Sequence, residues 1–229
     1  MTDDGIELDF SERNTRCFAN RIGNVRVGIS LQPVLGGPCY VWRNEILHTE
    51  YTPFKLHNAP QGGLIVHNTS IRRGVPLVVW SGEPVRDSWF RNNLFVGTEA
   101  QAADWTSPAV NCDLDYNGYC PGTGVFNLGN ARYASLGAAA RAGWEGNGRA
   151  VAWPVFESSV VLPEQPQQSM TIVPLELRAD SQAVDVAQRL PNLNIPFVGA
   201  GPDLGARERG APAPWYGPRP LADHNGVNE

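Results

Sequence analysis

The chain lacks an excess of basic charge, long apolar runs and a large number of cysteines. Its 229 residues include 18 basic and 23 acidic side chains, which gives a net charge of -5 and a pI near 5.4. Nucleic acids and anionic membranes both bind basic surfaces, so this charge argues against either partner. No apolar run approaches the ~18 residues that a membrane helix needs, so we also expect no membrane span.

Targeting and cofactor motifs are missing as well. The first ten residues, MTDDGIELDF, have neither the basic start nor the apolar segment of a signal peptide. A nucleophile elbow, a phosphate-binding loop, a dinucleotide fingerprint and zinc-ligand spacing are all absent. Four cysteines are too few for a disulfide scaffold. Cys112 and Cys120 can bridge a loop, whereas the Cα atoms of Cys17 and Cys39 should lie roughly 8 Å apart, which favours free thiols.

A repeat runs through the first half of the chain. Asn20, Asn44, Asn68 and Asn92 follow one another at a constant spacing of 24 residues. A fixed period of this length is typical of repeat architectures, in which stacked units share one core. Glycine and proline are abundant, with 24 and 19 residues, which predicts many turns and few long helices.

Apolar and polar residues alternate around these asparagines, which is the period of a strand with one buried face. The positions expected to point inward lie two residues before and two after each asparagine: Phe18, Trp42, Val66, Phe90, Ile22, Ile46, Ser70 and Leu94. The asparagines share this parity, and a lone buried amide is costly. We therefore predict that the asparagines of successive turns stack and hydrogen-bond one another.

A second set of strands recurs with nearly the same period. The segments are GIELD (5–9), GISLQ (28–32), PFKLH (53–57) and PLVVW (76–80), each opened by a turn residue. Their inward pairs are Ile6/Leu8, Ile29/Leu31, Phe54/Leu56 and Leu77/Val79. No apolar helical stripe runs through residues 5–97, which excludes a helical solenoid. The sequence therefore predicts an all-β fold, with a right-handed parallel β-helix (solenoid) over residues 3–120.

The second half of the chain follows the repeat less closely. The period slips by one residue at Asn117, and residues 121–150 are rich in glycine and alanine, with YASLGAAARAGW as a candidate short helix. Residues 151–162 look like one more strand-like pass, so we place coils at 3–162 with an insertion near 121–150. Residues 163–229 hold many prolines and glycines and predict an irregular C-terminal cap and tail. Asp203 is expected to cap turn N–H groups there.

Three stretches resemble the bacterial right-handed parallel β-helix repeat proteins of the pectin-lyase-like group. They are DDGIELD, the series NRI…WRNEI…HNTSI…FRNNLFVG, and ADSQAVDVAQRLPN…FVGAGPDLGARERG…YGPR. The last is similar to a common C-terminal ending of such proteins, although Arg207 and Arg209 replace commoner residues. The group includes lyases, hydrolases, epimerases and adhesins, so the resemblance implies a fold and leaves the activity open.

The resemblance also implies a setting for the chain. Members of the group are usually exported and have more coils before the DDGIE run. We therefore expect a secreted, extracellular protein of which this chain is a C-terminal portion, and we expect it to act as a monomer.

The outer face of the second strand set holds the main candidate site. Stacked strands bring its side chains within ~5 Å of one another between coils. In enzymes similar to this fold, such a face binds an acidic polysaccharide, a Lys, Arg or His removes the proton beside a uronate carboxylate, and acids hold Ca²⁺. The resemblance thus implies a catalytic set of Lys55, His57, Glu7 and Asp9, in which either Lys55 or His57 is the base. Asp3 and Asp4 are the implied metal ligands, and Asp4, Glu7 and Asp9 can each serve as an acid or as a Ca²⁺ ligand. Gln32 and Trp80 are the implied substrate contacts. The alternative is a solvated face of mixed charge.

Another outward column can bind a carboxylated or sulfated glycan. It consists of Arg43, His67 and Arg91, with Arg21 and Glu45 alongside. Its alternative is surface charge that keeps the sheet from associating.

Two further features have competing interpretations. DLDYNGY (113–119) spaces its acids like a calcium loop, but Gly124 stands where an EF-hand needs glutamate, so we expect a turn with side-chain-to-backbone bonds. Trp42 and Trp89 are expected to pack on the core. Trp80 should face outward, either as a sugar platform or covered by a loop.

Three functions follow. The first is binding or cleavage of an acidic polysaccharide, by β-elimination if the protein is an enzyme, as a lyase or glycoside hydrolase, with Ca²⁺ as the cofactor. The second is a non-catalytic surface-binding or adhesin-type module. The third is an inactive fragment.

Overall fold

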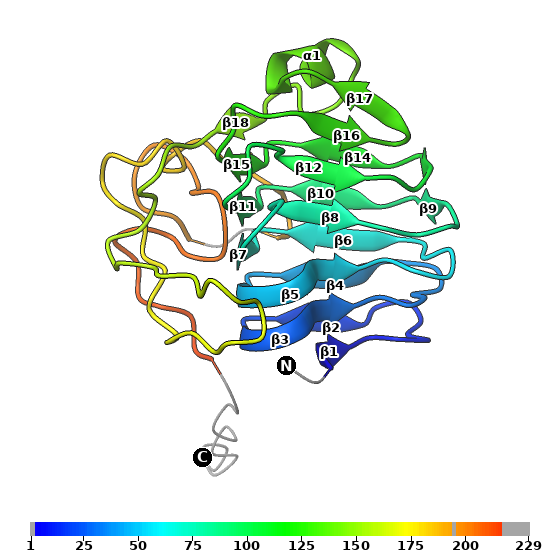
Figure 1. The fold of residues 1–229 in the computed structure, drawn as a ribbon, viewed down its shortest axis with the longest axis horizontal. Coiled ribbons are helices and arrows are strands. Elements are labelled where there is room, and N and C mark those ends of the chain that lie inside the picture. The colour runs from blue at the N-terminus through cyan, green and yellow to red at the C-terminus, as the bar shows by residue number, and fades with distance from the viewer. Residues whose placement is uncertain (1–2, 194–195, 217–229) are drawn as a thin grey trace, which may run out of the picture.

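The computed structural model describes residues 3–193 and 196–216 and shows a parallel β-helix of about five coils (Figure 1). This confirms the all-β solenoid predicted from the repeat. Successive coils pair in parallel, so each strand lies beside its equivalent one period later. Among the described residues, no helix is long and apolar enough to cross a membrane.

Most strands belong to three sheets, two that start in the first coil and a third that starts only at residue 77. The seven-stranded sheet contains, in order, β1 (Asp4–Glu7), β3 (Arg21–Ser30), β5 (Glu45–Lys55), β7 (Thr69–Ile71), β11 (Leu94–Val96), β15 (Gly118–Cys120) and β18 (Arg149–Ala150). The five-stranded sheet contains β2 (Arg16–Phe18), β4 (Cys39–Trp42), β6 (Gly63–Val66), β10 (Trp89–Arg91) and β14 (Asp113–Asp115). The four-stranded sheet contains β8 (Leu77–Val79), β12 (Ala103–Trp105), β16 (Phe126–Leu128) and β17 (Ala131–Tyr133). A short pair joins β9 (Val85–Arg86) to β13 (Ala109–Val110).

An asparagine ladder crosses the coils, as the sequence predicts. Each side-chain amide donates from Nδ2 to the Oδ1 of the next asparagine at 2.9 Å, in the order Asn20, Asn44, Asn68, Asn93 and Asn117. Each amide from Asn44 onward also donates to a backbone carbonyl of the preceding coil. The stacked amides therefore satisfy their hydrogen bonds without water.

The position of the fourth rung corrects the prediction. Asn93, not Asn92, continues the ladder, because the coil between Asn68 and Asn93 contains one extra residue. Asn117 lies 24 residues after Asn93 and is in phase with it. The expected slip at Asn117 is therefore wrong, and the slip lies one coil earlier.

Glu145 ends the ladder in the place where a sixth asparagine would stand. Its Oε1 accepts hydrogen bonds from Asn117 Nδ2 and from the Tyr119 hydroxyl, both at 2.7 Å, and its Oε2 accepts from the Asn117 N–H at 3.2 Å. Burial raises the pKa of this carboxyl to about 7, with a smaller contribution from the charge of Asp115. The last rung is thus closed by a titratable group.

A sharp bend before each ladder asparagine changes the expected orientation of the neighbouring strands. The residue just before each rung adopts a left-handed backbone, with φ between 50° and 58°: Ala19, Arg43, His67, Asn92 and Tyr116. Alternation therefore does not continue through the bend, and the core side chains of this sheet are Cys17, Val41, Ile65, Phe90 and Leu114. The prediction that Phe18, Trp42 and Val66 point inward is wrong. Leu94 is also misassigned, since it packs under the C-terminal segment.

The second strand set packs as predicted. Ile29, Leu31, Phe54, Leu77 and Val79 are fully buried in the main core, with Ile6 and Leu8 packed against it from the first coil. Their register matches across coils, with Ile6 beside Ile29 and Ile29 beside Phe54. The outward positions of these strands are therefore fixed relative to one another.

One end of the stack is covered by β17 and α1 (Leu136–Arg141) (Figure 1). β17 turns back antiparallel to β16, and the Ser135 hydroxyl caps α1 by accepting the Ala138 N–H. The predicted short helix is confirmed. Residues 151–162 contain no strand, and their antiparallel bridge from Phe156 to Leu177 joins the C-terminal segment, so the predicted extra pass is wrong. Their apolar side chains instead build a second core cluster with that segment.

The C-terminal segment lies along the side of the stack, against the seven-stranded sheet (Figure 1). It runs down the coils, with backbone groups of Pro163, Gln168 and Met170 bonded to Arg73, His48 and Asn24 in turn. It then climbs to Asn92, which accepts the Gln188 N–H, and descends a second time, with Ala206 and Arg207 bonded to Thr69 and Glu45. Asp203 accepts the N–H groups of Asp185 and Arg209, as predicted. The tail beyond residue 216 lies outside the described residues.

The four cysteines are free thiols. This confirms the prediction for Cys17 and Cys39 and leaves Cys112 and Cys120 unbridged. Burial raises the pKa of each thiol, so none is activated as a nucleophile.

Candidate functional site

The predicted site residues meet at a cavity of about 200 Å³ on the outer face of β1, β3 and β5. Strand register places Glu7 beside Ser30 and Ser30 beside Lys55. The predicted residues that line the cavity are Asp3, Asp4, Lys55, His57 and Trp80. Lys55 is the single lysine of the chain. The stacking of coils thus gathers groups that lie up to 77 residues apart, as the repeat predicts.

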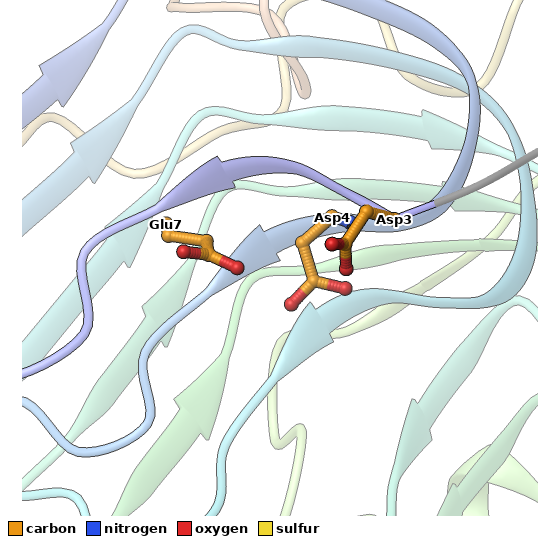
Figure 2. A group of neighbouring side chains, drawn as sticks. All are labelled: Asp3, Asp4 and Glu7. Atoms are coloured by element: carbon orange, nitrogen blue, oxygen red, sulfur yellow. Dashed lines mark hydrogen bonds between the residues drawn. The ribbon is translucent and has the colours of Figure 1, made fainter.

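Three carboxylates cluster at the entrance of the first coil (Figure 2). Asp3, Asp4 and Glu7 each offer an oxygen, and these oxygens lie within 4.8 Å of one another. Lys55 Nζ donates to Asp4 Oδ2 at 3.0 Å, and the Asp4 side chain is only 4% exposed. Carboxylate oxygens at this spacing are the donors that Ca²⁺ prefers, so the set fits one such ion, although Lys55 already occupies one oxygen of Asp4.

Two aromatic rings form an exposed wall of the cavity. Tyr51 and Trp80 are 43% and 42% exposed, and their ring centroids lie 5.5 Å apart in an edge-to-face arrangement. The guanidinium carbon of Arg26 lies 4.9 Å from the centre of the Tyr51 ring. Trp80 Nε1 donates to Asp104 Oδ2 at 3.3 Å, which holds the indole in place. The expected outward orientation of Trp80 is confirmed, and its ring is open to a ligand.

The cavity continues past Trp80 into a second hollow. This hollow has a volume of about 350 Å³ and shares His57 and Trp80 with the first. Its far side is formed by the turn that includes Ser81 and Glu83. The two hollows together give a groove with an indole and an imidazole at its middle, which suits an extended ligand better than a compact one.

Two predicted site residues have structural roles instead. Asp9 Oδ1 accepts hydrogen bonds from the Ser30 hydroxyl at 2.6 Å and from the Gln32 N–H at 2.9 Å. Asp9 thereby closes the turn at the end of its strand, and neither Asp9 nor Gln32 lines the cavity. Glu7 belongs to the carboxylate cluster and lies at its rim.

The second predicted column is covered by the C-terminal segment and does not face solvent. His67 is buried, and Arg91 bonds to Gln188 and to Asp113. Burial also lowers the pKa of Arg43 to about 10, opposed by the nearby charge of Glu208. The expectation of an exposed basic column is therefore wrong, because the cap uses these side chains for its own packing.

His67 is neutral in the fold, which makes it a source of acid sensitivity. Its pKa falls to about 3 because of burial and the charge of Arg43, although backbone bonds with Gly205 and Asp203 oppose the shift. The unfolded chain takes up this proton near pH 6.5, so stability is lost as the pH falls from 6.5 towards 3. We expect the wild type to lose roughly 4 kcal/mol more than His67→Asn over this range. Asparagine tolerates the left-handed backbone at this site.

The measurement for this prediction is the urea midpoint of both proteins across that pH range. Equal pH dependence of the two would show that His67 is protonated in the native state.

Residues 113–119 form β14, the bend at Tyr116 and the start of β15. Asp115 Oδ1 accepts the N–H groups of Tyr116 and Asn147, at 2.9 and 2.6 Å, and Asp113 pairs with Arg91. The expected side-chain-to-backbone bonds are confirmed.

Two residues of the site escape the sequence argument. Arg26 and Tyr51 line the cavity, but the pairing of β3 with β5 shifts by one residue between Val25 and Val27. A bulge of this kind turns neighbouring side chains to a new direction, and simple alternation cannot locate it. The left-handed residues Asn24 and His48 mark it in the structure.

Comparison with protein-family models, curated proteins and solved structures finds no match for the chain. The fold is established by the geometry above, and any function has to be argued from the residues of the site.

Proposed function

We propose that the chain binds an acidic polysaccharide in the groove over Trp80, and that His57 can act there as the base of a β-elimination. The observation that carries the proposal is the meeting of Lys55, Arg26 and His57 with two exposed aromatic rings in one groove. Aromatic faces suit the apolar faces of sugar rings, and cations bind their carboxylates. The groove continues on both sides of Trp80, which supports a chain as the ligand.

Lys55 and His57 have different roles in the proposal because their surroundings differ. Lys55, held against Asp4, offers a positive charge to a uronate carboxylate. His57 lies between the two hollows and reaches a sugar in either. In the elimination, the base removes the proton beside the carboxylate, and the released electron pair forms a carbon–carbon double bond. The bond to the glycosidic oxygen breaks with its electrons on that oxygen, which takes a proton from water and leaves as a hydroxyl group. A Ca²⁺ held by Asp3, Asp4 and Glu7 would neutralise the carboxylate and favour this proton loss.

The binding part of the proposal is tested on Lys55. Lys55→Met should weaken binding of polygalacturonate, alginate or chondroitin sulfate by about tenfold, because one charge-assisted contact is lost. Lys55→Arg, the matched control, keeps the charge and should retain most of the affinity. Affinity is measured by calorimetry at low and high salt. If none of these polymers binds the wild type, the proposal fails.

The catalytic part is tested on His57. Wild-type protein with Ca²⁺ should release an unsaturated uronate that absorbs in the ultraviolet, and His57→Gln should bind the polymer without releasing product. Binding by both proteins with product from neither would favour the second function, a non-catalytic binding module. Chelation of Ca²⁺ distinguishes the contribution of the metal from that of His57. It should reduce turnover in the wild type and leave the already absent turnover of His57→Gln unchanged.

A further inference from the structure

We infer a second glycan site on the five-stranded sheet, specific for an extended neutral chain. It lies on a different sheet from the groove over Trp80 and does not depend on the function proposed for that groove. Its centre is Trp89, which the sequence assigns to the core and the structure leaves 48% exposed. Two hollows of about 500 and 290 Å³ share Trp89 and Leu64, so the indole stands in the middle of a continuous groove.

The floor of this groove is built by strand register. One outward column carries a single side chain from each coil, in the order Arg16, Tyr40, Leu64, Trp89 and Asp113. The neighbouring column contributes Trp42, which stacks on Phe18 at 4.3 Å and meets Tyr40 edge to face at 6.1 Å. The wall opposite is the C-terminal segment at Leu190 to Leu193. The strands hold these rings in place, and the guanidinium carbons of Arg16 and Arg91 each lie 5.6 Å from the centre of the Tyr40 and Trp89 ring, respectively.

The spacing of the rings indicates the shape of the ligand. Tyr40 and Trp89 are two coils apart, which corresponds to about 10 Å along the stack axis. This is close to the length of two pyranose units. In a β-1,4-linked chain the sugar ring faces alternate, so every second unit presents the same face. Rings two coils apart therefore match alternate sugars of one extended chain.

The polar groups beside Trp89 indicate a neutral ligand rich in hydroxyls. Asp87 Oδ2 accepts a hydrogen bond from Gln61 Nε2 at 2.9 Å, and its Oδ1 accepts from Asn111 Nδ2 at 2.6 Å. Such a row of amide and carboxylate groups on successive coils can both donate to and accept from vicinal hydroxyls. Asp87 and Arg16, the charged residues that line the two hollows, carry opposite charges, so the groove has no net charge to attract an anionic sugar. Charge complementarity therefore favours a chain without carboxylates.

The test is calorimetry with cellohexaose, xylohexaose and mannohexaose. We expect saturable binding of at least one, weakened about tenfold by Trp89→Ala and also by Asp87→Asn. Asn is compatible with the left-handed backbone of residue 87, so the second variant keeps the bend and replaces one of the two oxygens that accept from Gln61 and Asn111. Trp80→Ala, in the other groove, is the matched control and should bind the neutral chain normally.

Several results would overturn the inference. They are the absence of saturable binding to all three oligosaccharides, equal affinities of the wild type and Trp89→Ala, and equal losses in Trp80→Ala and Trp89→Ala. A proline-rich peptide that binds at Trp89 while the oligosaccharides do not would also overturn it. Polygalacturonate binding that is lost in Trp80→Ala and kept in Trp89→Ala would show that the function proposed for the other groove holds independently.

Discussion

Replacing Asn68 with alanine is expected to lower the free energy of unfolding by about 4 kcal/mol. Asn68 is the middle rung of the ladder and is fully buried. Its Nδ2 donates to Asn93 Oδ1 and to the backbone oxygen of Val41, and its Oδ1 accepts two hydrogen bonds from Asn44. Alanine leaves these partners buried without a replacement, and water cannot reach them. The urea midpoint of the variant measures the loss.

The control for this prediction is Asn127→Ala. Asn127 is partly buried on the outer face and makes a side-chain bond of 2.9 Å to Asp104. Its loss should cost at most about 1 kcal/mol, because solvent can satisfy Asp104. If both variants are equally stable, the ladder contributes no more than a surface hydrogen bond.

Glu145 is expected to make the protein less stable as the pH rises from 4.5 to 7. Its folded-state pKa of about 7 lies above the ordinary 4.5, so the native state keeps a proton that the unfolded chain releases. The stabilisation is complete below pH 4.5 and is lost as the pH rises through 7, a difference of about 3 kcal/mol. The groups that face Glu145 are Asn117, Tyr119 and Asp115, and Tyr119 does not titrate in this window because its own pKa is raised.

Glu145→Gln isolates this effect. The amide keeps a hydrogen-bonding group below Asn117 and has no proton to exchange, so its stability should not fall between pH 4.5 and 7 on this account. The comparison has to be made between the two proteins, because His67 acts in the opposite direction over an overlapping range. Parallel curves for wild type and variant would mean that Glu145 is ionised in the fold.

The period of the asparagines is sufficient to predict the architecture, because a coil of this length can bury its apolar face only by stacking on the neighbouring coils. The same spacing misplaces the fourth rung, since Asn92 and Asn93 are adjacent and only the structure shows which amide lies over Asn68. The alternation of inward and outward side chains also fails to predict the core positions in the strands that precede the ladder asparagines. A left-handed residue interrupts the alternation just before each rung. The residues at this position share no chemical type from which the bend could be predicted: Ala19, Arg43, His67, Asn92 and Tyr116.

Some residues of the candidate sites could be placed from the sequence, and others could not. Lys55, His57 and Trp80 could be placed together because they lie in strands whose register the repeat fixes. The column of Arg43, His67 and Arg91 could not be recognised as buried, since its cover includes Gln188, Gly205 and Glu208, more than 90 positions away in sequence. Coverage by an irregular segment so far away in sequence leaves no pattern in the covered residues themselves. Trp89 is the opposite case, since the sequence predicts it in the core and the structure leaves it exposed.

The path of the C-terminal segment has a consequence for how the molecule comes apart. In a plain solenoid each coil touches only its neighbours, so coils at the ends can fray one at a time. Here the C-terminal segment descends as far as Asn24 and climbs back to Asn92, so it bonds to early and late coils at once. The coils that the segment contacts cannot unfold one at a time until the segment detaches. During synthesis the segment can dock only after those coils have folded.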